Sequence, residues 1–78
     1  MKIKFVKGIY GFVYDSIYGD ITQIFDKPIS KKERKTINKV ISEDDMLFLE
    51  EDIEDIKDMF GDIEELQWND KPILEQIK

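Results

Sequence analysis

The 78-residue chain contains no cysteine and no histidine, and both absences narrow the chemistry that it can perform. Without cysteine there are no disulfides and no thiolate nucleophiles or metal ligands. Without histidine the chain lacks the side chain that most often serves as general base, metal ligand or pH switch. The sequence therefore indicates no catalytic residue, no metal site and no cofactor site, and we expect a protein that is not an enzyme.

Long apolar runs are missing as well. No stretch approaches the roughly 20 residues that a membrane-spanning helix needs, and the opening MKIKFVKG lacks the apolar region of a signal peptide. No internal repeat or low-complexity linker divides the chain. We therefore expect one small domain over residues 1–78, located in the cytoplasm and near the lower size limit for a self-sufficient core.

Charge is distributed very unevenly along the chain. Residues 1–41 carry nine Lys and Arg against four acids, a net charge of +5, whereas residues 42–78 carry three Lys against fourteen acids, a net charge of -11. The two halves add to the net charge of -6. Such asymmetry is informative about charged partners rather than about the fold.

The first 26 residues have the composition of a β-hairpin. Residues Lys2–Tyr14 are rich in β-branched and aromatic side chains that alternate in period two, but the apolar positions change parity midway, which predicts a bulge at Lys7-Gly8. Turn-forming residues then lead into a second strand over Asp20–Asp26, which we expect to carry Ile21 and Phe25 on one face.

The opening KFVKGIYG also resembles the start of many small phage-encoded proteins. These begin with a Lys-rich strand, a Lys-Gly-x-Tyr-Gly step, a hairpin and a short helix. The resemblance covers Lys2–Gly11 and, more loosely, the first forty residues. The basic segment SKKERKTINKVI and the acidic segment after it depart from that pattern. The resemblance therefore implies a phage or mobile-element origin and assigns no functional residue.

Two helices are expected after the hairpin. The capping-box pattern from Ser30 to Glu33 predicts a short basic helix that starts at Lys31. Its cations are Lys31, Lys32, Arg34, Lys35 and Lys39, and its buried stripe is expected to be Ile37, Val40 and Ile41.

A longer acidic helix is predicted over Ser42–Leu66, with Ser42 as its N-cap. Gly61 either divides this helix, which we favour, or lies inside one continuous helix at a cost of about 1 kcal/mol. Its apolar positions are spaced by three and four residues: Met46, Leu49, Ile53, Ile56, Phe60 and Ile63. The predicted fold class is thus α+β, an N-terminal β-hairpin followed by the short basic helix and the longer acidic amphipathic helix packed on the sheet. Residues 67–70 read as a turn, and residues 71–78 as either a helical turn or an extended tail.

The polar side of the acidic segment carries like charges four residues apart, as in Glu50–Glu54 and Glu54–Asp58, which destabilise an isolated helix. One interpretation is a solvated face, or one neutralised by the basic helix. The other is a surface that docks on a basic, nucleic-acid-binding surface of a host protein, as an inhibitor or modulator that mimics nucleic acid. The partner-binding candidates are Glu50, Glu51, Glu54, Asp55, Asp58, Asp62, Glu64 and Glu65, with Trp68 or Phe48 as apolar anchor.

Two alternatives belong to other functional classes. A small phage accessory or assembly protein would form oligomers, of which a homodimer is the simplest, through complementary basic and acidic faces. Direct nucleic-acid binding would use the basic aromatic N-terminal half: Lys2, Lys4 and Lys7 with Tyr10, Phe12, Tyr14 and Tyr18. The sequence argues against this last function, because a small core needs those aromatic rings and the acidic half would repel the ligand.

Overall fold

The computed structural model describes residues 2–61 and 66–77, and its α+β class is the one predicted from the sequence. The elements in chain order are β1 (Lys2–Phe5), β2 (Gly11–Asp15), β3 (Asp20–Phe25), α1 (Lys31–Val40), β4 (Asp45–Leu49), the 3-10 turn η1 (Glu50–Asp52), α2 (Ile53–Phe60), β5 (Gln67–Trp68), β6 (Lys71–Pro72) and β7 (Leu74–Ile77).

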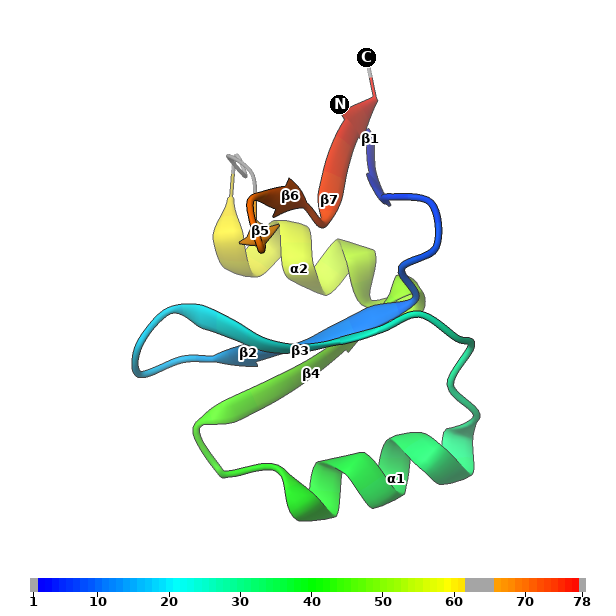
Figure 1. The fold of residues 1–78 in the computed structure, drawn as a ribbon, viewed down its shortest axis with the longest axis vertical. Coiled ribbons are helices and arrows are strands. Elements are labelled where there is room, and N and C mark those ends of the chain that lie inside the picture. Colours follow the sequence, from blue (N-terminus) through cyan, green and yellow to red (C-terminus); the bar gives the residue numbers. More distant parts are fainter. Residues whose placement is uncertain (1, 62–65, 78) are drawn as a thin grey trace.

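A three-stranded antiparallel sheet with the strand order β3-β2-β4 forms the middle layer (Figure 1). Helix α1 covers one face of this sheet. Helix α2 lies on the opposite face, together with the ribbon in which β1 pairs with β7, so the two chain ends lie side by side. The chain therefore builds three layers, with the two helices on opposite sides of the sheet.

Each face of the sheet has its own hydrophobic cluster. The α2 side contains Phe5, Phe12, Ile21, Phe48, Ile56, Ile73 and Leu74. The α1 side is smaller and contains Val13, Leu47 and Leu49, with Ile37 and Ile41 packed against them. Because consecutive strand residues point to opposite faces, the run from Leu47 to Leu49 supplies both clusters.

The predicted helix over Ser42–Leu66 is wrong in its first half and in its length. Residues Asp45–Leu49 form strand β4, and α2 has eight residues, fewer than the ten of α1. The physical reason is the apolar run Met46–Leu49. A helix would turn part of this run toward solvent, whereas a strand with both faces covered buries Leu47, Phe48 and Leu49. Ser42 does not cap a helix. Its carbonyl accepts the Asp45 N–H and so closes a turn before β4.

The N-terminal segment is two strands rather than one bulged strand. At Lys7-Gly8 the chain turns, with Gly8 at φ +88°, and passes from the β1–β7 ribbon into the central sheet. A bulge does exist, but in β3. Val13 lies opposite Gln23 and Tyr14 opposite Ile21, which leaves Thr22 as the extra residue. Consequently Ile21 packs in the α2-side cluster and Phe25 in the α1-side cluster, not on one face as predicted.

Helix α1 begins at Lys31 as the capping box predicts. The Ser30 hydroxyl accepts the Glu33 N–H at 3.2 Å. The predicted buried stripe is only partly correct, because Ile37 and Ile41 pack on the sheet but Val40 is 77% exposed. Val40 is the last residue of the helix and lies about 60° around its axis from Ile37.

The C-terminal residues are extended. Gly61, at φ +66°, ends α2 and donates its N–H to the Lys57 carbonyl. Asn69 and Asp70 both adopt positive φ in the two-residue turn between β5 and β6, the geometry of a type I′ hairpin. Strand β7 then pairs with β1, where Leu74 lies opposite Phe5 and both are buried.

Candidate functional site

Helix α2 presents carboxylates on the side opposite the core. Ile53, Ile56 and Phe60 lie on the inner side of the helix and pack in the α2-side cluster. At about 100° per residue, Glu54, Asp55 and Asp58 fall on the outer side, and all three are exposed. These three residues are called the acidic face below. It is shorter than the sequence predicts, because Glu50 and Glu51 lie in η1 rather than in the helix.

No cation of the described residues pairs with the acidic face. The ion pairs in this part of the chain are Lys4–Glu75, Arg34–Glu51 and Arg34–Asp52. The basic helix therefore neutralises two acids of η1 and none of α2. Pairing within the fold applies to Glu51 and Asp52. Glu50, Glu54, Asp55 and Asp58 are exposed and have no cationic partner within residues 2–61 and 66–77.

Arg34 joins α1 to the end of β4. Its guanidinium contacts Glu51 and donates from Nη2 to both carboxylate oxygens of Asp52, each at 3.2 Å. The Asp52 carboxylate, 13% exposed, also accepts the Leu49 N–H at 2.9 Å. Asp52 thus accepts a hydrogen bond from a backbone N–H on the unpaired edge of β4. Its carboxylate therefore stabilises the fold, a role that its negative charge alone did not indicate.

Helix α1 presents the opposite charge on the opposite side of the molecule. Lys31, Lys32, Lys35 and Lys39 are exposed, and none of them forms an ion pair within the described residues. Helices α1 and α2 lie on opposite faces of the sheet (Figure 1). The exposed cations of α1 and the acidic face are on the sides of these helices away from the sheet, since Ile37 and Ile56 pack toward it.

The remaining predicted partner-binding residues fall into three groups. Phe48 is not an exposed anchor, because it is 6% exposed inside the α2-side cluster. Trp68 is half-buried and packs against that cluster. Asp62, Glu64 and Glu65 lie outside the described residues. The structure adds Met59, which is 54% exposed beside Asp58.

The proposed aromatic nucleic-acid surface is not assembled. Phe12 is fully buried, Tyr10 and Tyr14 are half-buried, and Tyr18 alone of this set is exposed. The Tyr14 ring also packs edge-on against Phe60, at a centroid distance of 5.0 Å. Phe12 and Tyr14 are held in or against the core and are not available to stack on bases, in keeping with the need of a small core for these rings.

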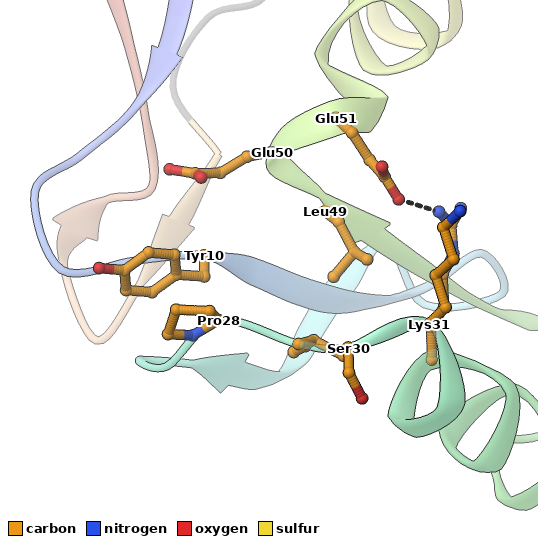
Figure 2. A pocket seen from close by; sticks show the side chains of 9 residues that line it. Tyr10, Pro28, Ser30, Lys31, Leu49, Glu50 and Glu51 are labelled. Atoms are coloured by element: carbon orange, nitrogen blue, oxygen red, sulfur yellow. Dashed lines mark hydrogen bonds and ion pairs between the residues drawn. The ribbon is translucent and has the colours of Figure 1, made fainter.

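A pocket of about 370 Å³ lies between the start of α1 and the β4–η1 junction, and Figure 2 shows Tyr10, Lys31, Glu50 and Glu51 around it. Glu51 is engaged by Arg34, and the remaining lining is Pro28, Ile29, Ser30 and Leu49. Within residues 2–61 and 66–77 no three acidic side chains come together as a metal site would require. Nor does any described helix combine the length and the apolar character needed to cross a membrane.

Comparison of the chain with protein-family models, with curated proteins and with solved structures gave no match. The charged faces of the two helices are therefore the features of this chain that bear on its function.

Proposed function

We propose that this is a non-enzymatic binding protein whose acidic face docks on a basic, nucleic-acid-binding surface of a host protein. It would act in the cytoplasm as an inhibitor or modulator encoded by a phage or another mobile element. The observation that carries the proposal is the state of Glu54, Asp55 and Asp58, which are exposed on one side of α2 and have no cationic partner among the described residues.

The spacing of these carboxylates supports mimicry of a nucleic acid. At a rise of 1.5 Å per residue, three charges fall within about 6 Å of helix axis. Duplex DNA carries one charge per roughly 1.7 Å. Glu50 continues the negative charge toward the N-terminal side of the helix. Charges at the rim of an interface mainly raise the association rate, so an apolar contact is needed to hold the complex, and Met59 is placed to make one.

Affinity capture from a nuclease-treated bacterial extract tests the proposal. The bait is the full chain, either unchanged or with Glu54→Lys, Asp55→Lys and Asp58→Lys. Glu51 is left unchanged because it pairs with Arg34. A matched control carries Asp20→Lys, Glu43→Lys and Asp44→Lys, the same change in charge at exposed sites outside α2.

We expect the unchanged protein and the matched control to capture the same basic host protein, and the α2 variant to lose it. Binding should also weaken with salt, because exposed charges are screened within about 10 Å at 0.1 M. Capture of the same protein by the α2 variant would show that the acidic face is not the docking surface.

A second candidate function is supported by the opposed charges of the two helices. Copies stacked head to tail would place the lysines of α1 against the acidic face of the next copy, and such heterologous contacts close into rings or extend as filaments. Sedimentation velocity at 50 and 500 mM salt separates this assembly role from the docking role. Oligomers that dissociate at the higher salt favour assembly, whereas a monomer at both concentrations excludes it.

A further inference from the structure

We infer that α1 forms a second interaction surface, which binds the phosphate backbone of a nucleic-acid duplex. The surface consists of Lys31, Lys32, Lys35 and Lys39 and is called the lysine face below. It is distinct from the acidic face and from the aromatic N-terminal surface considered above. It does not depend on the proposed host-protein partner.

The geometry of α1 places these lysines together. Ile37 points toward the sheet, where it packs with Val13, Leu47 and Leu49. Lys32, Lys35 and Lys39 follow at intervals of three and four residues on the opposite side, with Lys31 beside them. The helix contains one acid, Glu33, and its carboxylate accepts hydrogen bonds from the backbone N–H and the hydroxyl of Ser30. The four lysines therefore form a continuous cationic surface, and the one acid of α1, Glu33, is turned toward the N-cap Ser30.

Stability of the fold does not account for these cations. Lys31 and Lys32 occupy the first turn of α1, where positive charge opposes the helix dipole. Arg34 is the cation of α1 that holds acids of the fold, Glu51 and Asp52. The four lysines make no ion pair within the described part of the chain, so their charge is available to an external polyanion.

The acidic half does not cancel this attraction, because the sheet separates the two faces. Helix α1, the sheet and α2 are stacked along the longest axis of the molecule, whose Cα extent is 36 Å, with the sheet between the two helices (Figure 1). The Debye length is about 8 Å at physiological ionic strength. A polyanion on the lysine face therefore lies beyond the range at which the acidic face repels it strongly.

A duplex fits the lysine face better than a single strand or a membrane does. The axial intervals between Lys32, Lys35 and Lys39 are about 4.5 and 6 Å. Flexible lysine stems can match these to phosphates that rise about 3.4 Å per nucleotide. Helix α1 has no aromatic residue on which unpaired bases could stack. Its apolar residues Ile37 and Ile41 pack on the sheet, so they are not free to insert into a bilayer.

Contacts to phosphates alone predict binding that is weak, independent of sequence and strongly dependent on salt. Each phosphate neutralised on B-DNA contributes about -0.9 to the slope of log K against log salt. Three or four lysine contacts give a slope between about -2.7 and -3.6. Every lysine replaced by glutamine should reduce the magnitude of this slope by about 0.9.

The test is fluorescence anisotropy of a labelled 20-base-pair duplex, with the full chain at 25 to 150 mM KCl. The lysine variant carries Lys32→Gln, Lys35→Gln and Lys39→Gln. The control carries Glu54→Gln, Asp55→Asn and Asp58→Asn, and circular dichroism verifies that both are folded. We expect the lysine variant to lose at least tenfold in affinity and the control to bind at least as tightly as the unchanged chain. Two duplexes of different sequence should bind equally.

Three results would overturn the inference: no saturable duplex binding by the folded, unchanged chain at 25 mM KCl, equal binding by the lysine variant, or tighter binding to a single strand. Vesicles containing 30% phosphatidylserine are the comparison polyanion. Lysine-dependent binding to these vesicles without duplex binding would assign the surface to a membrane. Lysine-dependent self-association without duplex binding would assign it to a second copy of the chain.

Discussion

Replacement of Phe48 is the sharpest test of the fold, because the helix predicted from the sequence and the strand in the structure give it opposite environments. Phe48 is 6% exposed in β4, and its ring lies 5.3 Å from the ring of Phe12 and 6.0 Å from that of Phe60. Loss of two aromatic pairs at about 0.5 to 1.5 kcal/mol each gives a cost of about 1 to 3 kcal/mol for Phe48→Leu. The larger change Phe48→Ala should cost about 3 to 5 kcal/mol.

These costs are large for a chain of this length. A domain of 78 residues is expected to have a free energy of unfolding of about 4 to 12 kcal/mol. Urea denaturation followed by far-ultraviolet circular dichroism measures the change in this free energy. Met59→Ala is the matched control, because Met59 is an apolar residue that is 54% exposed, and its replacement should change stability by no more than about 0.5 kcal/mol. An equally small effect of Phe48→Leu would refute the placement of Phe48 in the core.

Three further substitutions test the close contacts around β4. A Cβ atom on Gly11 would lie 2.7 Å from both Leu49 Cδ2 and the Phe48 carbonyl oxygen, so we expect Gly11→Ala to lower the free energy of unfolding by about 1 to 3 kcal/mol. Stability unchanged in Gly11→Ala would mean that β2 and β4 are not packed so closely. Asp52→Ala removes the acceptor of the Leu49 N–H together with an ion pair to Arg34, and should cost about 1.5 to 3 kcal/mol. Glu51→Ala removes the more exposed partner of the same arginine and should cost at most about 1 kcal/mol, so equal costs for Glu51→Ala and Asp52→Ala would contradict the structural part assigned to Asp52.

Local signals in the sequence predict local structure well. The capping box from Ser30 to Glu33 involves residues three apart, so its hydrogen bonds require no distant part of the chain, and it sets the start of α1 correctly. Gly61 likewise ends α2, because the positive φ at that position suits a residue without a side chain.

The helix predicted over residues 42–66 shows where such signals become ambiguous. Met46, Leu49 and Ile53 have helical spacing, but Met46–Leu49 is also an unbroken apolar run that a strand between two covered faces buries completely. The pairing of β1 with β7 joins the two ends of the chain, and no local pattern in Lys2–Phe5 specifies that partner. Contacts between residues far apart in the sequence therefore determine both the strand at Asp45–Leu49 and the pairing of β1 with β7.

The charges of the candidate site are readable from the sequence, but their pairing is not. Glu51 and Glu54 look alike in the acidic segment, yet one meets Arg34 and the other faces solvent. The difference arises because η1 lies within reach of Arg34 in α1, whereas α2 lies on the opposite face of the sheet from α1. The separation of the lysine face from the acidic face is likewise a consequence of the layer order.

The most direct test of the central claim is a competition measurement with the captured host protein. The full chain carries Lys32→Gln, Lys35→Gln and Lys39→Gln, so that added duplex acts on the host protein rather than on the lysine face. Its dissociation constant for the host protein is measured at 150 mM KCl with increasing duplex DNA, and again after Glu54→Lys, Asp55→Lys and Asp58→Lys. We predict competitive displacement by the duplex and a loss of at least tenfold in affinity after charge reversal. A complex that the duplex leaves intact and that tolerates the charge reversal would contradict docking through the acidic face.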